Sequence, residues 1–216
     1  MLLAKKTIMF NTKKFKRDLY YKIPFGYWLA GLIDGDGYLG VSNKNYTSCE
    51  ITVGLKELIL LERVFLTLSG KITLRTETKS YRWRLHNKKD MGTLVKYIKG
   101  KCPLPSKKIQ LENVCKIVEI PNRNIHATFP GEAYWVSESL EAETYFNVNT
   151  LTLQCSVTLS QKTPELLYNL KDFIGGNVYY DKSWNGYLYS ASDTTFLDNW
   201  FTYLSNFPLL SRKKVD

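Results

Sequence analysis

Matched carboxylates mark two copies of one motif in this chain. Residues 27–41 read YWLAGLIDGDGYLGV, and residues 134–148, 107 positions later, read YWVSESLEAETYFNV. Asp34 and Asp36 of the first copy correspond to Glu141 and Glu143 of the second. Both positions therefore keep an acid, and the place in the first copy that holds Asp36 looks catalytic.

The second copy has lost the glycines of the first. Gly31 corresponds to Glu138, and Gly37 corresponds to Thr144. Glycine allows close packing and backbone conformations that other residues avoid, and we expect Gly37 to adopt such a conformation. A glutamate facing a partner helix would be buried unpaired at a cost of several kcal/mol, or would force the helices apart. Alternatively, the second helix is rotated and Glu138 pairs with a nearby base.

The composition indicates a folded protein with a polyanionic partner. The 216 residues suit two similar halves joined as an internal pseudo-dimer, and no apolar run reaches the roughly 20 residues of a membrane span. Four cysteines without CxxC spacing and two histidines give no zinc-finger pattern, so free, mostly buried thiols are expected. Residues 1–120 carry 23 Lys or Arg and 10 Asp or Glu, a net +13, whereas the remainder carries 7 and 10, a net −3.

The chain divides into a basic arm at 1–22, a first repeat at 23–119, a linker at 120–130 and a second repeat at 131–216. The arm is either a solvated tail or a segment that becomes ordered on nucleic acid. The basic residues of the arm that we expect to contact nucleic acid are Lys13, Lys14, Lys16 and Arg17.

Each repeat predicts the order helix, two strands, helix, two strands, helix, which is an α+β fold with antiparallel sheets. The first repeat has helices at 24–34, 56–69, 90–98 and 107–118, and strands at 38–44, 50–54, 72–77 and 81–86. The second has helices at 131–140, 164–174 and 194–204, and strands at 145–149, 151–160, 178–183 and 187–192. The last two strands form a hairpin across Asn185-Gly186.

The string LAGLIDGDG at 29–37 resembles the signature of the LAGLIDADG homing endonucleases, here of the two-repeat, single-chain type with a degenerate second motif. The resemblance implies tandem αββαββα repeats in a pseudo-twofold monomer. The signature helices, at 25–35 and 131–142, would touch across the axis, and two curved antiparallel sheets would lie in the DNA major groove.

The resemblance also implies site residues. Asp36 and Glu143 would bind Mg²⁺ ions that activate water and stabilise the leaving oxygen. Gln161 would orient the water, with Leu55 at the corresponding place in the first half, and Lys107 would assist hydrolysis. Arg212 would be the weaker counterpart of Lys107, because arginine stays charged.

The strand period predicts the faces of the sheets. In the first half a basic, polar face would contact nucleic acid, while Ile72, Leu74, Trp83 and Leu85 point to the core. The residues of that basic face are Lys71, Thr73, Arg75, Arg82 and Arg84. The second half would show an almost uncharged face of Asn147, Thr152, Gln154, Ser156, Tyr179, Asp181, Tyr187 and Tyr189.

Two functions are compatible with these features. The one favoured is a domesticated, non-cutting protein of an organelle, most simply the mitochondrion. It would bind RNA as a subunit of a large ribonucleoprotein such as an organellar ribosome, or as an intron maturase. Its acidic second half would suit protein neighbours. The alternative is an active, site-specific double-strand DNA endonuclease that uses Mg²⁺ between Asp36 and Glu143.

Overall fold

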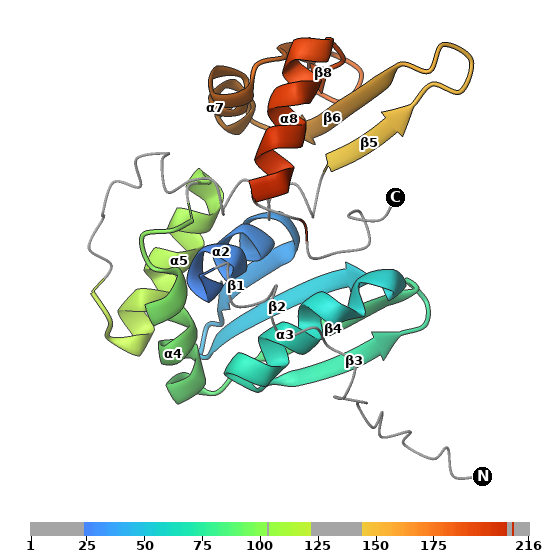
Figure 1. Ribbon diagram of the computed structural model, residues 1–216. Helices are drawn as coiled ribbons and strands as arrows, with labels where there is room; N and C mark the ends of the chain where they lie inside the picture. The colour runs from blue at the N-terminus through green and yellow to red at the C-terminus, as the bar shows by residue number, and fades with distance from the viewer. Residues whose placement is uncertain (1–23, 103, 122–143, 207–208, 210–216) are drawn as a thin grey trace, which may run out of the picture.

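The computed structural model describes residues 24–102, 104–121, 144–206 and 209, and shows one four-stranded antiparallel sheet in each half (Figure 1). The basic arm, most of the 120–130 linker and the predicted helix at 131–142 lie outside these residues. The predicted contact between the two signature helices therefore lies outside them as well. No helix in the described part of the chain is long and apolar enough to cross a membrane.

The first half follows the predicted order with one extra short turn. Its elements are α2 (Phe25–Asp36), β1 (Gly37–Val41), β2 (Thr47–Gly54), the 3-10 turn η2 (Leu55–Glu57), α3 (Leu58–Leu68), β3 (Lys71–Arg75), β4 (Ser80–Leu85), α4 (Lys88–Ile98) and α5 (Pro105–Val118). The strands lie in the order β1-β2-β4-β3. Helix α2 runs two residues further than predicted, through Gly35 to Asp36.

The second half repeats this order around a second sheet. Its elements are β5 (Thr144–Val148), β6 (Cys155–Gln161), α7 (Glu165–Ile174), β7 (Asn177–Asp181), β8 (Gly186–Ala191) and α8 (Thr194–Asn206), with the strand order β5-β6-β8-β7. Strand β6 begins four residues later than predicted, so Thr152 and Gln154 belong to the loop before it.

Corresponding residues form the core of each sheet. Trp83 lies between Ile51 and Ile72 in the first sheet, and Tyr189 lies between Leu159 and Val178 in the second. Both aromatic side chains are fully buried. Each ring also packs against a glycine with a positive φ, Trp83 against Gly70 and Tyr189 against Gly176. A Cβ on either glycine would collide with the ring.

Two predicted side-chain faces are wrong, and one side chain is less buried than expected. Leu74 lies on the same side as Ile72, as predicted, but is half exposed because it lies near the end of an edge strand. Tyr187 and Tyr189, expected on the open face with Tyr179, lie on the other face of β8, where Tyr189 is buried. Tyr179 pairs with Leu188, the residue between them, so it lies on the opposite side of the sheet from both.

Candidate nucleic-acid interface and candidate metal site

Helix α2 ends at Asp36, so the last acid of the first motif lies exposed where the helix meets β1. The carbonyl end of a helix carries partial negative charge, so this position favours a cation beside the carboxylate. Gly37 follows with φ −98° and ψ 159°, an ordinary extended conformation. The expectation of an unusual backbone at Gly37 is therefore wrong.

Gly37 is required for space rather than for conformation. A Cβ at this position would lie 2.6 Å from the Cα of Ile33 and 2.8 Å from its carbonyl oxygen. Its counterpart Thr144 begins β5, is fully buried, and has a hydroxyl without a hydrogen-bond partner in the described structure. A threonine cannot occupy the joint between helix and strand seen in the first half without shifting the backbone there.

Among the predicted catalytic residues that the structure describes, Lys107 contacts Gly37, the residue that follows Asp36. Its ammonium donates a hydrogen bond to the carbonyl of Gly37. Helix α5 begins at Pro105, which suits a first helical turn, and packs along β1. Gln110 of the same helix accepts a hydrogen bond from the backbone N–H of Leu39 at 3.0 Å, which holds α5 against the edge strand.

Gln161 lies at the end of β6, but its structural counterpart differs from the one predicted. Gln161 pairs with Tyr187, two residues before Tyr189, and Val53 pairs with Tyr81, two residues before Trp83. Since Tyr189 and Trp83 correspond, the structural counterpart of Gln161 is Val53. Leu55, the counterpart predicted from the sequence, lies in η2, two residues beyond Val53. The first half thus has a buried valine where the second has a partly buried glutamine.

The described residues supply only part of a metal site. Asp36 offers a carboxylate oxygen, the kind of ligand that Mg²⁺ prefers, so the chemistry of the position fits that ion. Glu143, the second predicted ligand, lies outside the described residues. Within the described ranges no group of three or more His, Cys, Asp or Glu residues is placed to hold a metal ion.

The buried cysteines near this place are unsuited to metal binding. Burial raises the pKa of the Cys49 and Cys102 thiols, and the Asp34 carboxylate beside Cys102 raises the pKa of that thiol further. Both therefore stay protonated at neutral pH, and a thiolate is the form that binds metals. All four cysteines are free and three of them are buried, as expected; Cys155 is exposed.

The basic face predicted for the first sheet is assembled by strand pairing. Arg84 lies opposite both Glu50 and Lys71, and Arg82 lies opposite both Thr52 and Thr73. Arg75 lies opposite Ser80, one rung further along. Because facing residues in a sheet point to the same side, the four predicted bases share one face.

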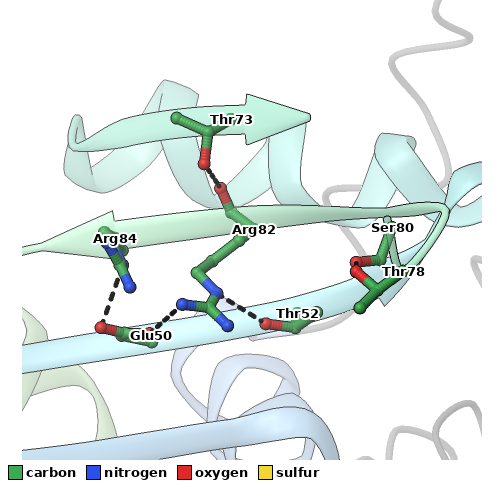
Figure 2. Close-up of polar contacts among 7 residues, drawn as sticks. All are labelled: Glu50, Thr52, Thr73, Thr78, Ser80, Arg82 and Arg84. Carbon is green, nitrogen blue, oxygen red and sulfur yellow. Dashed lines mark hydrogen bonds and ion pairs between the residues drawn. The ribbon is translucent and has the colours of Figure 1, made fainter. Parts of the chain in front are cut away.

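Glu50 orients two of these arginines (Figure 2). Its carboxylate forms ion pairs with Arg82 at 3.1 Å and Arg84 at 2.9 Å. Arg82 also donates from Nε to the Thr52 hydroxyl at 3.3 Å. The sequence analysis missed this role, although Glu50 alternates with Thr52 on the same side of a predicted strand. The carboxylate lowers the net charge of the face but holds both guanidinium groups in place.

The second sheet has no basic residue at the corresponding positions. Tyr38 and Tyr145 hold the same place in the two motifs. Tyr38 lies opposite Glu50 and Tyr145 lies opposite Thr158, so Glu50 corresponds to Thr158, and the remaining pairs follow in order. At each position where the first sheet has a basic residue, the second has a neutral or acidic one. Lys71, Arg75, Arg82 and Arg84 correspond to Asn177, Asp181, Leu188 and Ser190.

Comparison with known proteins identifies the family. A family model described as LAGLIDADG endonuclease matches residues 29–118 and again 134–216. The chain belongs to the LAGLIDADG endonuclease family. Its two matches coincide with the two sheets and confirm the two-repeat fold.

Similar proteins include an RNA maturase and a probable endonuclease, both encoded by introns. The chain is 32% identical over 95% of its length to an intron-encoded RNA maturase, bI4, of Saccharomyces cerevisiae, and 29% identical over 76% to a probable intron-encoded endonuclease, aI2, of Debaryomyces hansenii. It spans about a third of the first relative (34%) and about a quarter of the second (27%).

Solved structures of meganucleases show the same fold. The LAGLIDADG meganuclease I-AabMI bound to uncleaved DNA matches with a TM-score of 0.65 at 20% identity, covering 88% of this chain and 87% of that one. I-LtrWI bound to its target DNA matches with a TM-score of 0.67 at 16% identity, covering 88% and 86%.

Proposed function

We propose that this chain is an intron-encoded RNA-binding protein of the maturase type, which keeps the endonuclease fold but does not cut DNA. One observation carries the proposal: the basic face of the first sheet has no counterpart in the second. A protein that holds a DNA duplex along both sheets needs basic residues on both sheets, because phosphate contacts supply most of the affinity. The relation to bI4 supports RNA as the ligand.

The proposed RNA contact is the basic face of the first sheet, together with Lys13, Lys14, Lys16 and Arg17 of the arm. Arginine suits this role because its planar guanidinium forms paired hydrogen bonds with phosphate and with guanine. The acidic second half would face protein neighbours, and the chain would act as a monomer with internal pseudo-symmetry. Intron-encoded relatives, one of them from a cox1 intron, favour a mitochondrial site of action.

Binding to the intron transcript tests the proposal. The probe is an RNA containing the intron in which the reading frame lies, with both exon ends, and the control is an unrelated folded RNA of equal length and base composition. The protein should bind the intron transcript at least tenfold more tightly than the control and should accelerate its splicing. Equal affinity for both RNAs would contradict the maturase function.

A DNA endonuclease is the second candidate, and the first motif favours it. Asp36 is exposed at the end of α2, and Lys107 donates a hydrogen bond to the carbonyl of the next residue, Gly37. In that case Asp36 and Glu143 would hold the Mg²⁺ ions, which supply an activated water and a stabilised leaving oxygen. Lys107 and Gln161 would then position the attacking water. Thr144 opposes this candidate, because it does not fit the helix-to-strand joint on which the first motif depends.

A further inference from the structure

A pocket of about 530 Å³ opens at one end of the second sheet, between the turn that enters α7 and the β7–β8 hairpin. Its lining combines aromatic rings, one base, one acid and neutral polar groups. The lining residues are Lys162, Thr163, Pro164, Glu165, Tyr180, Asn185 and Tyr187. The pocket lies on the side of the sheet opposite Tyr179, and therefore away from the open face that corresponds to the basic face of the first sheet.

Two tyrosines form the aromatic wall of the pocket. Tyr180 and Tyr187 lie opposite each other on β7 and β8, with ring centroids 5.2 Å apart. Half of the Tyr180 surface remains exposed, although its hydroxyl is fixed by a 2.7 Å hydrogen bond to Oδ1 of Asn185. The ring of Tyr180 is thus held in place with surface still available for stacking.

Lys162 braces the hairpin turn that carries Asn185. Its ammonium donates to the carbonyl of Trp184 at 2.6 Å and to that of Asn185 at 3.0 Å. The Trp184 ring lies back over Gly186, where a Cβ would be 2.1 Å from the indole. The turn is therefore shaped before any ligand arrives, and a preformed site loses less conformational entropy on binding.

The first half keeps one of the two tyrosines and has aliphatic side chains at the other two corresponding positions. The rung Gln161–Tyr187–Tyr180 corresponds to Val53–Tyr81–Leu74. Leu74 is half exposed, as Tyr180 is, but offers no ring for stacking. The exposed ring of Tyr180, and with it the pair of facing rings, therefore belongs to the second half alone and is not needed to complete the sheet of this fold.

We propose that this pocket binds one unpaired nucleobase of a single-stranded segment. The base would stack on Tyr180, where aromatic faces accept any base. Asn185 and Thr163 would offer hydrogen bonds to its edge, and the remaining N–H of Lys162 would reach the adjoining phosphate. Glu165 at the rim disfavours a phosphate inside the pocket, so the base enters and the backbone stays outside.

This proposal rests on the proposed function and narrows its ligand. Structured RNA presents unpaired bases in loops and bulges, whereas a DNA duplex keeps its bases stacked. The second sheet, which lacks the basic residues needed to bind phosphates, would then contribute through stacking. The two halves of the chain would read different features of one RNA.

The test compares three tyrosines of similar exposure. Tyr180→Leu copies Leu74 of the first half, and Tyr180→Ala removes the ring altogether. Tyr179→Leu changes the neighbouring residue on the opposite face of β7, and Tyr168→Leu changes an exposed tyrosine of α7 outside the pocket. Affinities are measured for a short single-stranded RNA, for single-stranded DNA of the same sequence, and for the corresponding duplex.

Both Tyr180 variants should weaken single-strand binding about tenfold, which is within the range found when one base loses its stacking partner. Duplex binding, and the affinities of the Tyr179 and Tyr168 variants, should stay within twofold of the unchanged protein. A loss on both single strands identifies base stacking, and a loss on RNA alone adds contacts to the 2′-hydroxyl; both results support the pocket.

The proposal is overturned if the unchanged protein does not bind single strands, or if Tyr180→Leu and Tyr168→Leu have equal effects. Thermal unfolding of each variant excludes loss of fold as the cause, and Tyr180→Leu retains apolar packing if Tyr180→Ala unfolds. Failure of the maturase function is recognised separately, as equal affinity for the intron transcript and the control RNA. That result leaves the single-strand comparison decisive.

Discussion

The two sheets share one architecture and differ in charge at every basic position of the proposed binding face. The first sheet has four bases and the orienting Glu50, and the second has two neutral polar residues, a leucine and an aspartate at the positions of the bases. The cores differ far less, since Trp83 and Tyr189 play the same part. The fold of a repeat can thus be retained without the basic residues of its open face, because the buried core and the charged residues lie on opposite faces of the sheet.

The largest effect should follow from removing the bases of the first sheet. Replacing Arg75, Arg82 and Arg84 together by glutamine should weaken nucleic-acid binding by about 100-fold and lower the slope of log affinity against log salt by about 3, because each phosphate contact releases counterions. Replacing Asn177, Tyr179 and Ser190 of the second sheet by alanine should leave that slope unchanged. Fluorescence anisotropy across a salt series measures both slopes. An equal change of slope in the two sets of variants would show that the two faces contribute equally to binding.

The two helix-to-strand joints should respond to mutation with opposite signs. Gly37→Ala places a Cβ against the backbone of Ile33 and should destabilise the protein by about 1–3 kcal/mol. Thr144→Val removes a buried hydroxyl without a described partner at nearly constant volume, and should stabilise it by about 1 kcal/mol. Urea unfolding measures both. A destabilising Thr144→Val would show that the hydroxyl makes a contact beyond the described residues.

Adding basic residues to the second sheet should increase the affinity for duplex DNA. Asn177→Lys with Ser190→Arg copies the rung formed by Lys71 and Arg84. This double variant should bind duplex DNA about tenfold more tightly and steepen its salt slope by about 2, since two phosphate contacts become available. The matched control, Asn177→Gln with Ser190→Asn, adds size without charge and should change neither quantity. An unchanged slope in the charged variant would mean that this face does not approach the duplex.

The smallest effect concerns Glu50. Glu50→Gln releases Arg82 and Arg84 from their ion pairs, which are worth about 0–1 kcal/mol at such exposure. Non-specific affinity should rise about threefold because the face gains net positive charge, while discrimination between related sequences should fall because the guanidinium groups lose their orientation. Parallel titrations with matched and mismatched targets measure both changes. Improved discrimination would contradict the orienting role.

Much of the fold could be predicted because the residues that define it are local. The repeat placed Tyr38 and Tyr145 correctly at the same point of two sheets, and alternation placed Lys71, Arg75, Arg82 and Arg84 on one face. Pairing across the β7–β8 hairpin was less accessible. The Asn185-Gly186 signal marked the turn, yet Gly186 already pairs with Asp181 in the sheet. The sequence does not show that Tyr179 pairs with Leu188, and because side chains alternate along a strand this pairing puts Tyr187 and Tyr189 on the other face from Tyr179.

The site was predicted less completely than the fold because its properties depend on contacts between distant segments. The motif indicated Asp36, and Lys107 was found by family resemblance. The reason for Gly37 was misjudged, because only the structure shows Ile33 filling the space of a Cβ. The match of Gln161 to Val53 also depends on strand pairing, and it lies two residues from Leu55, the counterpart predicted from the sequence.

DNA cleavage tests the central claim most directly, because it separates a protein that keeps only the fold from one that keeps the chemistry. The purified protein is incubated with Mg²⁺ and a large library of randomised duplex targets, and cut ends are sequenced beside those from the Asp36→Asn variant. We expect no site to be cut reproducibly by either protein. A single site cut by the unchanged protein and spared by Asp36→Asn would contradict the account and identify a working homing endonuclease.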